Sequence, residues 1–137
     1  MLLKSFTDGG ARGNPGPAGI GVVLRGTDDA IVERFGEYIG ETTNNQAEYR
    51  AMIAALERAK ELGATEVEAH ADSELLVKQL HREYRVKNPD LAPLFVKIWN
   101  LAQGFSRCTF THVRREQNKD ADAMVNAAID ARGRVDG

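Results

Sequence analysis

The sequence predicts an α/β domain, and three observations lead to this fold class. Three strand-like segments with short connections open the chain. A long amphipathic segment that begins with a capping signal follows them. The remainder alternates short β-branched segments with helical ones, which is typical of parallel strands joined by helices. The length of 137 residues suits a single hydrophobic core.

Two predicted strands, residues 2–7 and 20–25, flank a stretch rich in glycine and proline. The stretch covers residues 8–19, begins with Asp8 and reads DGGARGNPGPAG. Glycine lets another backbone approach closely, and proline stiffens the turn. We expect Asp8 at a rigid strand end beside an open surface. A tight hairpin with a solvated aspartate is the simpler alternative.

A third strand is predicted at residues 30–39, because the polar turn at 26–29 has the composition of a hairpin connection. The first three strands are therefore expected to form an antiparallel meander.

The helix predicted over residues 43–62 carries a carboxylate on its apolar side. Thr43 and Gln46 fit a capping box at its start. Glu48 lies one turn before Met52, on the stripe that faces the core. A carboxylate at such a position is costly unless something pairs with it. A partly exposed glutamate in the first turn is the alternative.

A strand at residues 66–71 ends at Asp72, and Ser73 is a candidate cap for a helix over 74–80. A strand between two helices indicates a parallel partner, and ligands of such sheets bind beyond the carboxyl ends of the strands. Asp72 is a candidate ligand-binding residue for this reason, although aspartate is also common in helix caps.

The last third of the chain predicts a helix, a strand and a helix, at residues 91–103, 108–113 and 119 to about 132. We interpret the aromatic residues of the first of these helices as core, because they recur at helical spacing. Asn118 is a candidate cap for the last helix, which has Asp122 in its first turn.

Composition and net charge indicate the cellular compartment and constrain the kind of partner. The single cysteine, Cys108, excludes an intrachain disulfide, and no long apolar run or signal peptide is evident, so we expect a cytoplasmic protein and by default a monomer. The formal net charge is −2. A nucleic-acid partner would therefore need a local basic face or metal ions for its binding.

Four carboxylates, those of Asp8, Glu48, Asp72 and Asp122, each belong to a strand end or a first helical turn. If the strands that end at Asp8 and Asp72 are neighbours, all four can converge. Two carboxylates about 4 Å apart repel by roughly 4 kcal/mol at an effective dielectric constant of 20. Oxygen ligands of this kind suit Mg²⁺ or Mn²⁺, and a pair of such ions can hydrolyse a phosphodiester.

The motifs around these carboxylates resemble those of ribonuclease H type 1. The stretch TDGG at residues 7–10 together with GNPGPAG at 13–19 is similar to its first motif, and TTNNQAE at 42–48 to its second. The shorter stretches ADS at 71–73 and AD at 121–122 are similar to the third and fourth. The resemblance covers residues 1–132 and leaves 133–137 as an expected disordered tail.

The resemblance implies a five-stranded mixed sheet with helices on both faces. Its first three strands are antiparallel, and the later two run parallel to the first. It also implies an endonuclease that cuts the RNA strand of RNA–DNA hybrids and leaves 5′-phosphate and 3′-hydroxyl ends. Two ions, Mg²⁺ or Mn²⁺, would be held by the four carboxylates, with Asp8 bridging both.

Substrate contacts follow from the same resemblance. It implies that asparagine side chains reach the minor groove, where they test for 2′-hydroxyl groups, and that Thr43 lies near a phosphate of the DNA strand. The alternative is that these amides only cap the helix and the turn. The expected substrate-binding residues are Arg12, Asn14, Thr43, Asn44, Asn45 and Gln46.

Two features of many family members are missing. Residues 114–120 contain no histidine where a flexible histidine loop is usual, and His112 is expected to be structural. Glu116 is one hypothesis for a substitute. The segment at 81–90 is too short for the usual basic protrusion, so Arg82, Arg85 and Lys87 form either a reduced phosphate track or a solvated face.

In lacking both features, the sequence resembles the compact archaeal and actinobacterial branch of the family. Some members of that branch are fused to other domains or also accept double-stranded RNA, which is therefore a candidate second substrate.

Two other functions fit parts of the sequence. A non-catalytic module that binds hybrids would have the same fold, but all four acidic positions are filled here. An unrelated metal-binding protein that acts on nucleotides would not explain the asparagine-rich second motif. The nuclease interpretation accounts for both features.

Overall fold

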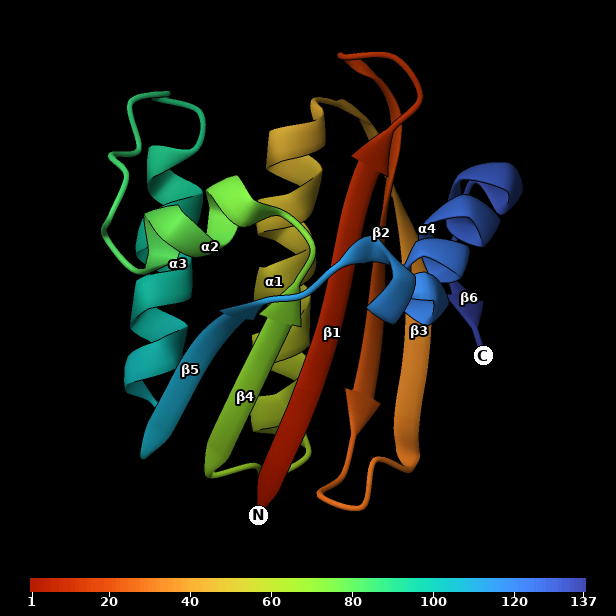
Figure 1. Ribbon diagram of the computed structural model, residues 1–137. Coiled ribbons are helices and arrows are strands. Elements are labelled where there is room, and N and C mark those ends of the chain that lie inside the picture. The colour runs from red at the N-terminus through yellow and green to blue at the C-terminus, as the bar shows by residue number, and fades with distance from the viewer.

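The computed structural model describes residues 1–137 and contains one mixed sheet with helices on both faces (Figure 1). The sheet order is β5-β4-β1-β2-β3-β6. β1 pairs antiparallel with β2 and parallel with β4, β2 pairs antiparallel with β3, and β4 pairs parallel with β5. The predicted five-stranded arrangement is confirmed. The strands are β1 (Leu2–Ala11), β2 (Gly16–Arg25), β3 (Ile31–Thr42), β4 (Glu66–Ala71), β5 (Arg107–His112) and β6 (Val135–Asp136).

The glycine-rich stretch extends the first hairpin instead of forming one long turn. Gly10 pairs with Gly19, and Ala11 pairs with Ala18, so only residues 12–15 lie outside the two strands. Small side chains weaken a strand when considered alone, but here they admit helix backbones to both faces of the sheet. Asp8 therefore lies within a long strand, not at its end.

Four α-helices and one short 3₁₀ helix cover the sheet. α1 and α3 lie behind it in the view of Figure 1, while α4 crosses the opposite face over β1, β2 and β3. Thr43 caps α1 by accepting a hydrogen bond from the Gln46 N–H at 3.2 Å, as predicted. The helices are α1 (Asn44–Glu61), α2 (Glu74–Leu80), α3 (Ala92–Gln103), η1 (Arg115–Gln117) and α4 (Lys119–Ala131).

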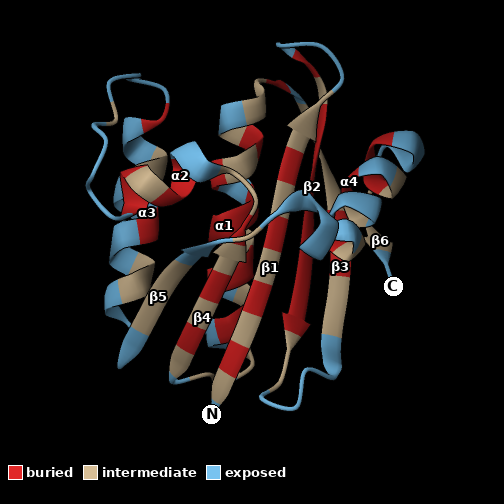
Figure 2. Cartoon of the chain, in the orientation of Figure 1, coloured by how far each residue is buried: buried red, intermediate tan, exposed pale blue.

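The main core lies between the sheet and α1. It includes Leu3 and Val67 from the strands and Met52 and Leu56 from α1. Figure 2 shows the matching alternation of buried and intermediate residues along β1 and β4, and burial along nearly all of β2. The prediction that the aromatic residues of α3 are core is wrong for Trp99, whose residue surface is 40% exposed.

The predicted disordered tail is also wrong for residues 133–136. β6 pairs with β3 at Gly36 and Phe35, and the Gly133 carbonyl accepts a hydrogen bond from the Tyr38 N–H at 3.2 Å. Arg134 adds an ion pair with Glu37 at 2.7 Å. β3 would otherwise be an open sheet edge, and these residues pair with part of its backbone.

None of the helices has the length and apolar character that a membrane span requires.

Candidate active site

Two of the four carboxylates lie where neighbouring parallel strands separate. The β1–β4 ladder runs as far as the pair Thr7 and Ala71, so Asp8 and Asp72 directly follow the last pair. β4 then leaves the sheet for α2, whose cap is Ser73. Both aspartates are half-buried. The sequence analysis made convergence of the carboxylates conditional on these two strands being neighbours, and the register shows that they are.

Glu48 is brought to the same place by a close approach of α1 to β1. A Cβ atom added at Gly9 would lie 2.3 Å from the Ala47 carbonyl carbon and 2.5 Å from the Glu48 nitrogen. Only glycine fits there, so α1 begins directly against the residue that follows Asp8. The capped first turn of α1 thus holds Glu48 in a half-buried position next to Asp8.

Asp122 reaches the site from the opposite face through a second close approach. A Cβ atom at Gly21 would lie 2.1 Å from the Ala121 carbonyl oxygen, so only glycine in β2 lets α4 start this close to the sheet. Asp122 follows Ala121 and is exposed to solvent. Its carboxyl group lies close enough to that of Asp8 to contribute to the raised pKa of Asp8.

All four carboxylates line one pocket of about 340 Å³. Arg12 and Asn44 line the same pocket. The other predicted substrate-binding residues, Asn14, Thr43, Asn45 and Gln46, lie outside its lining.

The charge of this pocket is poorly compensated. Burial raises the pKa of Asp8 to about 8, and the Asp72 charge and the hydrogen bond to Asp122 add to the shift, while the Gly9 N–H opposes it. Burial likewise raises the pKa of Glu48 to about 7, with the Ser73 hydrogen bond opposing the shift and the Asp72 charge adding to it. Carboxylates with such pKa values mark functional sites more often than structural ones.

The donor set fits a hard divalent cation. The acidic side chains of the pocket offer carboxylate oxygens, and no histidine or cysteine lines it. As they lie, no three acidic, histidine or cysteine side chains are arranged to enclose an ion. Their mutual repulsion and raised pKa values are what a bound cation would relieve. The residues present therefore suit Mg²⁺ or Mn²⁺ better than zinc.

Comparison with known proteins identifies the family. The family described as reverse transcriptase-like matches residues 6–128. Ribonuclease HI of Halobacterium salinarum is 46% identical over 128 residues, which cover 93% of this chain and 64% of that protein. The crystal structure of RNase H1 from the same archaeon has a TM-score of 0.94 at 44% identity and covers 96% of this chain and 99% of that chain. The chain belongs to the ribonuclease H family.

Two further members show the range of the family. A bifunctional protein of Mycobacterium tuberculosis is 46% identical over 132 residues, which cover 96% of this chain and 36% of that protein. This chain spans less than two thirds of the mycobacterial and the Halobacterium protein. The structure of LC11-RNase H1, isolated from compost, contains an RNA/DNA hybrid. That protein is 46% identical, with a TM-score of 0.91 and coverage of 95% of this chain and 98% of that chain.

The segment between β5 and α4 brings an arginine to the pocket. In Figure 1 this segment passes the end of β4 and crosses β1 part-way along that strand. Arg115, in η1, lines the carboxylate pocket, and its charge lowers the pKa of Glu48. Glu116 and His112 do not line it. Sequence reasoning missed Arg115, although a loop that joins β5 to α4 must pass the end of β4 and cross β1.

Asn118 is the N-cap residue of α4, as predicted, but its side chain makes no cap hydrogen bond. The Asn118 Nδ2 atom instead donates to the Thr7 carbonyl at 2.8 Å, because that carbonyl lies where β4 has already left the sheet.

The asparagines of the first two motifs join the β1–β2 turn to α1. Asn44 Oδ1 accepts a hydrogen bond from the Ala11 N–H at 2.8 Å, and Asn14 Oδ1 accepts one from the Asn44 N–H at 3.1 Å. Arg12 pairs with Asp130 of α4 at 2.7 Å. The turn is thereby fixed to both helices that carry carboxylates.

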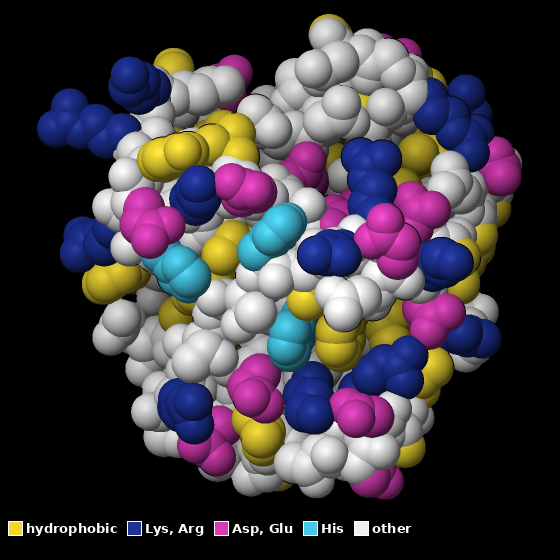
Figure 3. All heavy atoms as spheres, viewed as in Figure 1, with side chains coloured by type: hydrophobic (Ala, Val, Ile, Leu, Met, Phe, Trp, Pro, Cys, Tyr) yellow, Lys and Arg dark blue, Asp and Glu magenta, His cyan; other side chains and the backbone are white.

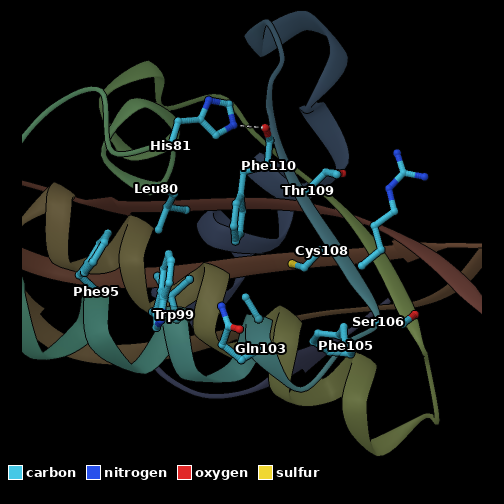
Figure 4. A pocket seen from close by; sticks show the side chains of 13 residues that line it. Leu80, His81, Phe95, Trp99, Gln103, Phe105, Ser106, Cys108, Thr109 and Phe110 are labelled. Carbon is cyan, nitrogen blue, oxygen red and sulfur yellow. Dashed lines mark hydrogen bonds between the residues drawn. The ribbon is translucent and has the colours of Figure 1, made fainter.

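A second hollow, of about 500 Å³, lies between α3 and the outer edge of β5, and we call it the α3–β5 groove. Its side chains are largely apolar and include Phe95, Trp99 and Phe110 (Figure 4). His81 closes its upper end by a 2.6 Å hydrogen bond to the Phe110 carbonyl. Elsewhere on the face seen in Figure 3, basic and acidic side chains are interleaved, so this face has no broad basic surface.

Proposed function

We propose that this chain is a ribonuclease H that cleaves the RNA strand of RNA–DNA hybrids and leaves 5′-phosphate and 3′-hydroxyl ends. One observation carries the proposal: four carboxylates from β1, α1, the end of β4 and α4 line a single open pocket with little compensating charge. The hybrid bound to LC11-RNase H1, a relative with nearly the same fold, supports the choice of substrate.

Asp8, Glu48, Asp72 and Asp122 hold two divalent ions in this proposal. Divalent ions bound there supply Lewis-acid activation of a water molecule and stabilise the leaving oxygen. The four side chains must be ionised for this role, so Asp8, whose pKa is raised to about 8, gives up its proton when the ions bind. The rigid attachment of each residue to a strand or to the start of a helix keeps the donor atoms in place.

The fixed asparagines suit recognition of RNA. Because backbone N–H groups occupy the Oδ1 atoms of Asn14 and Asn44, their amide nitrogens are the atoms free to donate outward. Donors match the 2′-hydroxyl oxygen and the acceptors of the minor-groove base edges. Asn45 is exposed beside them, and Gln46 follows it in the same turn.

Phosphate contacts are assigned to three side chains. The Thr43 hydroxyl oxygen accepts the Gln46 N–H, so its own proton is free to reach a phosphate of the DNA strand. Arg12 and Arg115 are the cations that line the pocket, where each can balance a phosphate of the bound strand.

The test is cleavage of an end-labelled RNA–DNA hybrid with Mg²⁺ or Mn²⁺. Asp8→Asn removes a ligand and is expected to reduce kcat by about 10³-fold or more. Asp29→Asn, at an exposed aspartate paired with Lys4, is the matched control and keeps full activity. EDTA abolishes cleavage by the native chain.

Duplexes of RNA alone and DNA alone, with the same sequence, define the substrate. Cuts confined to the RNA strand of the hybrid support the proposal, and cuts in the RNA duplex extend it. Tight hybrid binding without cleavage would instead assign the chain as a non-catalytic hybrid-binding module.

A further inference from the structure

Asn118 is a buried polar residue at the junction of three carboxylate-bearing segments. Only 2% of its surface is exposed. Its Nδ2 atom donates to the Thr7 carbonyl at 2.8 Å, and its backbone carbonyl accepts from the Asp122 N–H at 3.1 Å. One residue thus binds the backbone immediately before Asp8 and the backbone of Asp122.

The side-chain bond completes an interrupted sheet. The parallel ladder of β1 and β4 ends at Thr7 and Ala71, after which β4 turns away toward Asp72. The Asn118 amide supplies a donor to β1 where the neighbouring strand stops. The two backbones that carry Asp8 and Asp72 therefore separate at the point where Asn118 is inserted.

Capping of α4 does not explain why residue 118 is an asparagine. It makes no cap bond to α4, and its Oδ1 atom is buried without a hydrogen-bond partner. An unpaired buried acceptor destabilises the folded state, and a leucine of similar size would avoid that cost. The Nδ2 bond is thus the only polar contact that the amide makes.

We propose that Asn118 is a positioning residue that fixes the start of α4, and with it Asp122, relative to Asp8. The inference rests on the proposed function, because the spacing of these carboxylates matters only if they share ions. Asn118 does not line the carboxylate pocket. It acts through the Thr7 carbonyl and the Asp122 N–H.

The test compares Asn118→Leu, which keeps the volume and removes the donor, with Tyr49→Phe. The Tyr49 hydroxyl donates a buried hydrogen bond to Gln79, and neither residue lines the carboxylate pocket. Tyr49→Phe therefore removes one buried hydrogen bond, as Asn118→Leu does, but away from the pocket. Three quantities are measured well below the unfolding temperature: Mn²⁺ affinity by calorimetry, and kcat and KM for the hybrid.

We expect Asn118→Leu to weaken Mn²⁺ binding and lower kcat by about 10–100-fold each, as is usual for residues that orient metal ligands. KM for the hybrid should stay within about twofold, because no substrate-binding side chain is altered. Tyr49→Phe should lower the unfolding temperature and leave the other quantities unchanged.

Unchanged Mn²⁺ affinity and kcat in folded Asn118→Leu would overturn the inference. If that variant does not fold, Asn118→Ser, which is smaller and keeps a hydroxyl, decides in the same way. Failure of the proposed function looks different, because the native chain itself would then fail to cleave hybrids, whatever Asn118 variants do to Mn²⁺ binding.

Discussion

The carboxylate pocket and the α3–β5 groove are hollows on the same sheet with opposite physical character. The pocket is the smaller, at about 340 Å³ against about 500 Å³, and is lined by four carboxylates and by cationic or amide side chains that include Arg12, Arg115 and Asn44. The groove is lined mainly by aromatic and aliphatic side chains from α3 and β5.

The titratable groups show the difference most clearly. In the groove, burial alone raises the pKa of Cys108, to about 11, so this thiol stays neutral near pH 7. In the pocket, neighbouring charges add to burial and bring the pKa values of Asp8 and Glu48 close to neutral pH. Unrelieved charge, and not volume, therefore distinguishes the site from a packing defect.

The largest effect is expected in the groove and should leave the pocket untouched. Ile98 is fully buried and lines the groove, so Ile98→Ala should lower the free energy of unfolding by about 2–4 kcal/mol through the cavity that it leaves. Urea unfolding gives this value, and kcat for hybrid cleavage should not change at a temperature where the variant is folded. A parallel loss of kcat would break the separation of the two regions.

In the pocket, by contrast, removing the Asp8 carboxylate should stabilise the metal-free chain at high pH. The pKa of Asp8 is about 8 in the folded chain and close to 3.8 when unfolded, so the folded state binds the extra proton between these values. The free energy of unfolding of the metal-free native chain therefore falls as pH rises from 4 to 8. Asp8→Asn should therefore be the more stable chain at pH 8, and the two chains should be nearly equal in stability at pH 4.

Thermal unfolding across this pH range measures the effect, with Asp29→Asn as control. The pKa of exposed Asp29 is lowered, mainly by its hydrogen bond from Lys4, so its contribution is present above the unfolded value and is lost as pH falls. Asp29→Asn should give no gain at pH 8. An Asp8→Asn gain that is independent of pH would contradict the electrostatic explanation.

A smaller effect tests the cation at the rim of the pocket. Arg115→Gln should reduce kcat/KM by about tenfold, because a phosphate contact and a charge that favours ionised Glu48 are both lost. Lys97→Gln is the control, since Lys97 is an exposed cation that pairs with Glu57 and does not line the carboxylate pocket. A larger loss in Glu116→Gln than in Arg115→Gln would restore Glu116 as the substitute for the missing histidine.

Features that depend on local patterns can be predicted from the sequence. Capping signals locate α1 and α2, and alternating segments locate the strand that precedes Asp72. The four sequence motifs single out the four carboxylates that line the pocket. Features that depend on distant backbone cannot be predicted in this way. The extension of β1 through its glycines requires α1 and α4 to pack on them, and β6 requires the open edge of β3.

The sequence also does not predict the contacts of single side chains that depend on distant backbone. Asn118 looks like a helix cap in the sequence, but the departure of β4 creates a carbonyl that binds its amide more directly. Trp99 lies one helical turn after Phe95, yet it is exposed at the groove because no element covers the outer edge of β5. Arg115 belongs to no motif, and only the path of its loop across the sheet brings it to the pocket.

The central claim is that the pocket's poorly compensated carboxylates exist to bind divalent ions. Calorimetric titration of Mn²⁺ into the metal-free chain at pH 7, in two buffers of different ionisation enthalpy, tests this directly. The account predicts saturable binding with release of protons, because Asp8 is protonated at this pH without metal, and loss of both signals in Asp8→Asn. Equal binding by both chains, or binding without proton release, would contradict it.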